Sequence, residues 1–363
     1  AFRIRAGRAA GERRLSAEPP TRIFVYTPHD GDCLPERYLK PGIDRETLAR
    51  RRIRMRDWGA NRVAAALAAE LGVGGYARAR IARVLLDLNR FPGTTSAAAN
   101  NPLDYFSIME PFGSTLAHAE KMELLRIYDE MSNAIEQMID GSMISLAIHT
   151  YDAHNPSATK RPDVSLISTP RSYLHESRMP DRLFDPAYPD LLAESTCNRA
   201  LRDRISLNLE RNDYRVSQNQ PYPLPEGSIE VRAQVWSFFN FVRQRFEAAH
   251  PESVEDEAMH RVWTMLLDTN LRDTQSEALR GYLHRYHRPS TAEQARTFER
   301  ARDAYTRVRE FIANTRVVSD FRRAPHRPSN LAIEVRKDLL ISFDEDGRPL
   351  PVTPEQERVA RDV

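Results

Sequence analysis

The stretch Ile23-Phe24-Val25-Tyr26-Thr27, followed at once by Pro28-His29-Asp30-Gly31, decides how the rest of the chain is interpreted. A run made only of β-branched and aromatic residues that stops at a proline is typical of a buried strand. In open α/β sheets the functional groups collect where strands end at their carboxyl edge. We therefore expect the polar residues after Pro28 to lie at such an edge.

The segments that follow alternate between helical and strand patterns. Residues 57–71 carry apolar side chains at helical spacing and end at glycines, and residues 81–88 form a second apolar run. An amphipathic helix is expected at 117–138 and a third strand at 143–149. This order predicts an α/β fold with a mixed, largely parallel sheet flanked by helices.

The pattern changes in the second half of the chain. From 229 to 315 it is almost entirely helical, with Arg and Glu between the apolar positions, and an apolar strand carrying one carboxylate returns at 330–335. The predicted organisation is a flexible basic arm at 1–20, the first part of the α/β core at 21–231, a helical insertion at 232–325, a core strand with its glutamate at 326–345 and a C-terminal tail at 346–363.

Composition restricts the classes of function. The 53 Lys and Arg residues nearly balance the 51 Asp and Glu residues, so a net charge of +2 gives no global field that would steer the protein to nucleic acid or anionic membranes. No stretch approaches the roughly 20 apolar residues of a membrane span. Cys33 and Cys197 lie far apart, which argues against a disulfide framework. We expect a cytoplasmic protein that binds neither nucleic acid nor membranes.

Polar side chains stand at the end of each predicted strand. They include two histidines, several carboxylates and two arginines, namely His29, Asp30 and Asp32 after the first strand, Asp87, Asn89 and Arg90 at the second, His149 at the third, and Glu334 and Arg336 in the late strand. When these groups converge on one edge of a sheet, they have the composition that is typical of a metal-hydrolase site.

A catalytic zinc ion takes three protein ligands and leaves one position open. His29 and His149 are the natural nitrogen ligands. Two carboxylates compete for the third place: Asp32, which gives an H-x-x-D spacing, and Asp57, which opens the following helix and is favoured because a helix N-terminus holds a carboxylate ionised. Zinc suits this set best, although iron or manganese also accept it.

The remaining polar groups suggest how a substrate would be bound and cleaved. A carboxylate within an apolar strand, such as Glu334, must be paired, protonated or placed in a cavity. Beside a metal it can act as general base, while a structural ion pair with Arg336 or a neighbour is the alternative. The guanidinium of Arg90 can bind a substrate carboxylate in bidentate fashion, or it can pair internally with Asp87.

These motifs resemble the N-formylglutamate amidohydrolase family, relatives of the zinc carboxypeptidases and aspartoacylases. The matching pieces, in chain order, are Pro28-His29-Asp30-Gly31 with Leu34-Pro35, Asp57-Trp58-Gly59-Ala60, Arg83-Val84-Leu85-Leu86-Asp87-Leu88-Asn89-Arg90, Ile148-His149, Arg161-Pro162-Asp163-Val164, Asn219-Gln220-Pro221-Tyr222 and Ile333-Glu334-Val335-Arg336-Lys337-Asp338-Leu339. The resemblance covers roughly 20–225 and 325–345.

The resemblance implies a zinc-carboxypeptidase-like fold and a metal-dependent amidohydrolase that cleaves an amide next to a carboxylate, in an N-formyl or N-acyl amino acid or at a peptide end. It implies His29, His149 and an acidic third ligand around the metal, with Glu334 as the base. Arg90, together with Asn89 of the same motif, would bind the substrate carboxylate. Arg336 lies on the same strand face as Glu334 and could assist in substrate binding.

Two alternatives remain open. The helical insertion could form a groove for a peptide-processing hydrolase, or an interface in a homo-oligomer. The chain could instead be a catalytically silent relative that serves as a binding scaffold. The presence of every expected ligand and of Glu334 favours the enzyme.

Overall fold

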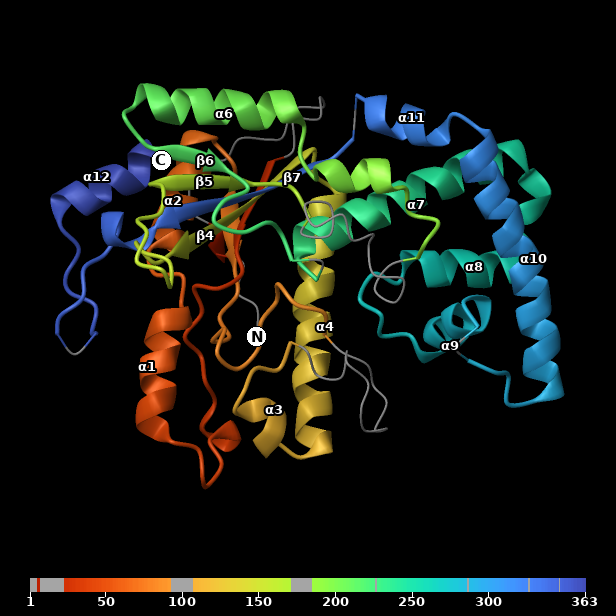
Figure 1. Ribbon diagram of the computed structural model, residues 1–363, viewed down its shortest axis with the longest axis horizontal. Coiled ribbons are helices and arrows are strands. Elements are labelled where there is room, and N and C mark those ends of the chain that lie inside the picture. Colours follow the sequence, from red (N-terminus) through yellow and green to blue (C-terminus); the bar gives the residue numbers. More distant parts are fainter. Residues whose placement is uncertain are drawn as a thin grey trace.

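The computed structural model describes residues 5–6, 23–92, 107–170 and 185–363, except 226, 286, 326 and 346 (Figure 1). The basic arm predicted at 1–20 lies outside this range apart from the two residues of β1. Among the described residues, no helix combines the length and the hydrophobicity that a membrane crossing requires.

Seven strands of the described chain form one sheet, in the order β1-β3-β2-β4-β7-β5-β6. Their bounds are β1 (Arg5–Ala6), β2 (Ile23–Thr27), β3 (Gly75–Arg78), β4 (Ile144–Tyr151), β5 (Val164–Ile167), β6 (Val216–Gln218) and β7 (Ser329–Arg336). Pairing is parallel between β2 and β3, β2 and β4, β4 and β7, and β5 and β6. It is antiparallel between β1 and β3 and between β5 and β7. The mixed, largely parallel sheet is therefore confirmed.

Helices cover both faces of the sheet, which explains why its central strands are apolar throughout. On one face, Val25, Ile148 and Ile333 pack with apolar side chains of α2 (Ala60–Glu70), α6 (Arg199–Arg211) and α12 (Pro354–Asp362). On the other face, Tyr26 and Ala147 join the cluster that includes α4 (His118–Asp140) and α7 (Ile229–Ala249). Because side chains alternate along a strand, His149 and Glu334 face the α7 side.

After residue 228 the described chain is mostly helical up to 323. It forms α7, α8 (Glu257–Leu267), α9 (Thr274–Leu283), α10 (Ala292–Asn314) and α11 (Val317–Arg323). Figure 1 shows α8 to α11 at one end of the molecule and α2, α6 and α12 around the sheet at the other. A single cluster of buried side chains continues from Phe24 of the sheet to Trp263 and Phe298 of these helices. The borders of the predicted insertion stay a prediction.

The prediction of a second strand at residues 81–88 was wrong. The strand in this part of the sheet is β3 (Gly75–Arg78), and residues 81–88 form a loop with isolated bridges from Ile81 to Cys33 and from Leu86 to Ile108. The loop is apolar because it is buried: Leu85 and Leu86 are almost fully enclosed. Periodicity does not separate a short buried loop from a buried strand.

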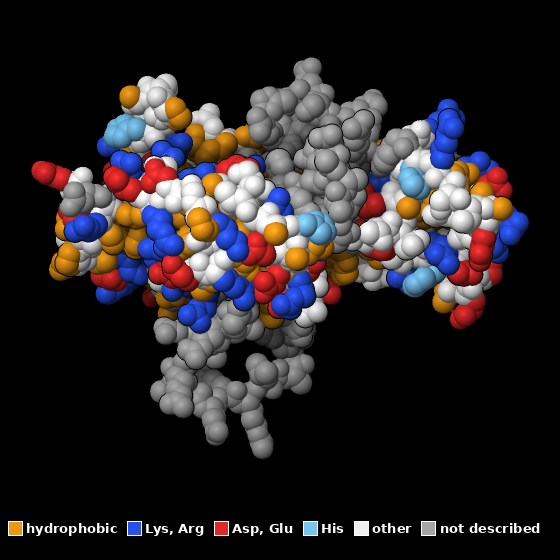
Figure 2. Space-filling model, turned by 90° about the horizontal axis from the view of Figure 1, so that it is seen from below, with side chains coloured by type: hydrophobic (Ala, Val, Ile, Leu, Met, Phe, Trp, Pro, Cys, Tyr) orange, Lys and Arg blue, Asp and Glu red, His pale blue; other side chains and the backbone are white. Residues whose placement is uncertain are grey.

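The described residues contain further helical elements. They are α1 (Arg45–Met55), α3 (Phe112–Thr115) and the 3₁₀ turns at Glu36–Tyr38, Asp190–Glu194, Pro251–Ser253 and Lys337–Leu339. On the described part of the face in Figure 2, Lys and Arg side chains are interspersed with Asp and Glu. No single sign of charge dominates that face, in agreement with the balanced composition.

Candidate metal centre

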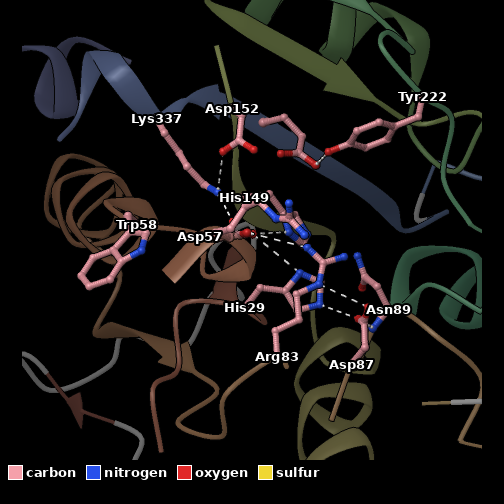
Figure 3. A network of polar contacts seen from close by, with 12 residues as sticks. His29, Asp57, Trp58, Arg83, Asp87, Asn89, His149, Asp152, Tyr222 and Lys337 are labelled. Atoms are coloured by element: carbon pink, nitrogen blue, oxygen red, sulfur yellow. Dashed lines mark hydrogen bonds and ion pairs between the residues drawn. The ribbon is translucent and has the colours of Figure 1, made fainter. Parts of the chain in front are cut away.

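Three predicted ligands meet at the carboxyl edge of the sheet (Figure 3). His29 follows β2, His149 lies in β4, and Asp57 stands in the turn ahead of α2. Their candidate ligand atoms all lie within 4.8 Å of one another, and all three side chains are buried. The Nδ1 atom of His149 is 2.9 Å from Oδ2 of Asp57, and Nδ1 of His29 is 3.6 Å from the same oxygen. Both imidazoles thus turn their Nδ1 atoms to one carboxylate.

The backbone ties the turn of Asp57 to the end of β2. The Asp57 amide donates to the carbonyl of His29 at 3.1 Å. Gly59 has a φ of +89°, and an added Cβ would stand 2.8 Å from the side chain of Leu340, so this position favours glycine. Helix α2 begins at Ala60, three residues after Asp57, and the carboxylate that accepts from its first turn is Asp30, through the Asn61 amide at 3.1 Å.

Asp87 anchors the second nitrogen of His29. Its Oδ1 is 2.8 Å from His29 Nε2, and its Oδ2 accepts from Nε of Arg83 at 3.2 Å and from Nε of Arg90 at 3.3 Å. Burial would raise the pKa of Asp87, but Arg83 and His29 hold it well below its ordinary value. An ionised Asp87 accepts the Nε2–H of His29, which leaves the Nδ1 lone pair directed toward Asp57 and His149.

The pKa shifts of Asp57 and His149 show that the centre favours a positive charge. Burial would raise the pKa of Asp57, but hydrogen bonds with His149 and His29 lower it far below its ordinary value. Burial would lower the pKa of His149, whereas Asp57, Glu334 and Glu230 raise it to about 9. A divalent cation would supply the charge that a proton on His149 otherwise provides. The buried Nδ1 of His29 has no hydrogen-bond partner among the described residues, as a ligand atom requires.

Glu334 lies directly beside the candidate ligands. It is the cross-strand partner of His149 in β7 and is 6% exposed. Its Oε1 accepts from the Tyr222 hydroxyl at 2.5 Å, and its Oε2 has no partner within the described chain. Burial raises its pKa, and His149, Tyr222 and Arg83 oppose that shift.

The structural alternative for Glu334, an ion pair with Arg336, is not formed. The guanidinium of Arg336 instead binds Asp163 through Nη1 at 2.7 Å and Asp338 through Nε at 2.6 Å. The predicted role of Arg336 in substrate binding stays a prediction.

The other predicted residues differ in their surroundings. Asp32 is 61% exposed at its side chain, pairs with Arg56 and is not part of the ligand group. Arg90 pairs with Asp87, as the alternative interpretation had it, and is 40% exposed. The backbone N–H of Asn89 donates to Asp87 Oδ1 at 3.0 Å. The side-chain oxygen of Asn89, Oδ1, is buried and has no partner among the described residues. The structure thus groups Asp57, and not Asp32, with the histidines.

Sequence reasoning gave no role to Arg83 or Tyr222, and it placed Asp87 at the sheet edge without a role other than a possible pairing with Arg90. Nη1 of Arg83 lies 3.8 Å from Asp57 Oδ1, so this arginine bridges the ligand carboxylate and Asp87. Burial would lower the pKa of Arg83, but Asp87 and Asp57 raise it above its ordinary value, so the side chain stays charged. The sequence could have indicated a role for Arg83 and Tyr222, because both lie within the quoted motifs that contain Asn89 and Pro221.

Two histidines and a carboxylate at the carboxyl edge of an α/β sheet form a group that could hold a metal ion. The family model of N-formylglutamate amidohydrolases matches residues 21–235, more than half of the chain. The chain belongs to the N-formylglutamate amidohydrolase family, whose members are hydrolases of amide bonds.

Among solved structures, an N-formylglutamate amidohydrolase from Ralstonia eutropha matches at 14% identity and a TM-score of 0.47, with 96% of this chain and 92% of that chain covered. A gene product from Agrobacterium tumefaciens matches at 14% identity and a TM-score of 0.43, with 94% of this chain and 86% of that chain covered. A search of curated proteins finds no match.

Proposed function

We propose that this protein is a metal-dependent amidohydrolase that cleaves an amide bond next to a carboxylate, with N-formyl or N-acyl amino acids as substrates. One observation carries the proposal: the buried ligand atoms of His29, Asp57 and His149 lie within 4.8 Å of one another, with Glu334 on the neighbouring strand. The family supplies the substrate class, since its name specifies N-formylglutamate.

His29 Nδ1, His149 Nδ1 and a carboxylate oxygen of Asp57 would hold the metal. Two nitrogens and one oxygen suit zinc, and also iron or manganese. The cation supplies Lewis acidity toward the scissile carbonyl and makes water a better nucleophile. The protein contributes the orientation of the ligands, because Asp87 fixes His29 and the Asp57 turn is bound to the end of β2.

Glu334 is the general base of this proposal. The Tyr222 hydroxyl occupies its Oε1, so Oε2 is the oxygen that takes a proton from water and passes it to the leaving nitrogen. Burial raises its pKa, which makes the carboxylate a better base than an exposed glutamate. Its place opposite His149 puts this proton transfer beside the ligands.

The arginines provide the charge for a carboxylate-bearing substrate. Arg90 follows Asn89, contacts Asp87 through Nε and is 40% exposed, and a guanidinium can bind a carboxylate in bidentate fashion. Arg83, held between Asp57 and Asp87, adds a second positive charge close to the ligands. The proposed substrate therefore carries its carboxylate on the Arg90 side of the scissile amide.

The test begins with purification without chelators and a measurement of metal per chain in the wild type and in His149→Ala. About one divalent ion per wild-type chain, lost in the variant, is expected. Turnover is then measured on N-formyl-L-glutamate, other N-acyl amino acids and short peptides. No metal in the wild type, even after zinc is added, would contradict the proposal. Bound metal without turnover of any carboxylate-bearing amide would favour a binding scaffold.

A further inference from the structure

Glu230 is a fully buried carboxylate that the mechanism above does not use. It lies in the first turn of α7, which starts where the Ser228 side chain accepts from the Val231 amide. Its Oε1 accepts from the Tyr26 hydroxyl at 2.8 Å, and its Oε2 has no hydrogen-bond partner within the described chain. A buried carboxylate oxygen without a donor costs free energy, so this oxygen needs an explanation.

The position of Glu230 follows from the register of the sheet. Tyr26 in β2 is the direct neighbour of Ala147 in β4, and His149 stands two residues further along β4 on the same face. Helix α7 packs over this face and contributes Val231 and Val235 to the cluster that contains Tyr26 and Ala147. Glu230, which rests on Tyr26, is therefore held on the sheet face from which His149 projects.

The two histidines of the centre differ in one respect. The Nε2 atom of His29 is bound by Asp87, whereas Nε2 of His149 is buried and has no partner among the described residues. A metal-binding imidazole almost always donates its second N–H to a carboxylate, a carbonyl or a water molecule. His149 needs such an acceptor once its Nδ1 binds a metal, and Glu230 has an acceptor oxygen to offer.

We propose that Glu230 is the positioning residue of His149: its Oε2 accepts the Nε2–H of His149, directly or through one water molecule, when the metal is bound. This inference rests on the proposed metal site. Glu230 then does for His149 what Asp87 does for His29. The competing acceptor is Glu334, whose Oε1 is already taken by Tyr222 and whose Oε2 serves in proton transfer.

The helices that follow residue 228 then take part in the metal centre, because the first of them, α7, supplies the group that fixes a metal ligand. Their role goes beyond covering the sheet or forming an interface with another subunit. The competing explanation is that Glu230 serves only the hydrogen bond with Tyr26, as a structural pair in the core.

The experiment compares zinc affinity in the wild type and Glu230→Gln, with Glu257→Gln as the matched control. Glu257 also lies in the first turn of a helix, but its side chain is 74% exposed and pairs with Arg261 of the same helix. Competition with a chromophoric chelator should show zinc binding weakened by about 10- to 100-fold in Glu230→Gln. The control should bind as the wild type does. The visible spectrum of the cobalt-loaded protein should shift in Glu230→Gln alone.

Equal zinc affinity and identical cobalt spectra in the wild type and a folded Glu230→Gln would overturn the role of Glu230. A second measurement needs no folded variant. In the zinc-loaded wild type, NMR should detect two slowly exchanging imidazole N–H protons, one each from His29 and His149, and a single signal would contradict the inference. Failure of the wild type to bind zinc would instead contradict the proposed function itself.

Discussion

Asp87 Oδ1 lies 2.8 Å from His29 Nε2, and both side chains are only 1% exposed. This hydrogen bond is buried, so it fixes the orientation of one candidate ligand. Arg83 and Arg90 bind the other oxygen of Asp87, Oδ2, and keep this carboxylate ionised. In this position Asp87 would act on a bound metal through His29.

Replacement of Asp87 by asparagine should therefore weaken metal binding by about 10- to 100-fold, because a neutral amide is a poorer acceptor for the His29 N–H. A metal titration checks this expectation. Asp203→Asn is the control, since Asp203 is half exposed and pairs with Arg202 far from the centre. Equal affinities in the two variants would show that Asp87 does not orient His29.

Asp57→Ala should abolish stoichiometric metal binding, whereas Asp32→Ala should leave it intact. The reason is geometric: Asp57 shares its Oδ2 with both imidazoles, while Asp32 binds Arg56 at the surface. Metal content per chain after dialysis separates the two. Retention of the metal in Asp57→Ala, with loss in Asp32→Ala, would reverse the assignment of the third ligand.

Much of the fold could be predicted because the buried strands are built from β-branched and aromatic residues. The strand at 23–27 and the one that carries Glu334 were recognised in this way. The loop at 81–88 was misassigned because burial, and not strand formation, makes it apolar. Helix α1 was missed, since it is rich in arginine and buries only Leu48. A helix with so little apolar surface lacks the periodic signal.

The candidate site was partly predictable for a related reason. His29 and His149 stand at or near the ends of recognisable strands, and the topology brings such ends together. The contacts that support the ligands join residues distant in sequence: His29 and Asp87 are 58 positions apart, and Tyr222 and Glu334 are 112 apart. No local pattern encodes these pairs, so they emerge only from the folded chain.

Glu334→Gln should reduce kcat by roughly 10²- to 10⁴-fold, the usual contribution of a general base. Gln keeps the size of the side chain and can still accept from Tyr222, so metal content and thermal stability should remain close to those of the wild type. Steady-state kinetics and metal analysis of the same preparation check both expectations. Undiminished turnover would remove Glu334 from the proposed chemistry.

Tyr222→Phe should move the acid limb of the pH–rate profile to higher pH. The Tyr222 hydroxyl stabilises the ionised form of Glu334 and so lowers the pKa of this carboxyl, which burial raises. Loss of the hydroxyl removes that stabilisation, and the base then protonates at a higher pH. The profile of kcat against pH is the measurement, and a limb that stays in place or moves down would contradict the assignment.

The metal-free protein should lose thermal stability as the pH rises from about 6.5 to about 9. Burial lowers the pKa of His149, but Asp57 and Glu334 overcome this and raise it to about 9, so protonated His149 stabilises the folded state. That contribution is complete below the unfolded-state pKa, which is near 6.5 for histidine, and disappears as the pH passes the folded-state value. The midpoint of thermal unfolding, Tm, followed against pH, should fall in this interval for the metal-free wild type and change less in His149→Gln. With zinc bound, the fall should be absent, because the metal replaces the proton on the imidazole. A metal-free wild type whose Tm stays constant over the interval, in parallel with His149→Gln, would show that the carboxylates do not hold a proton on His149.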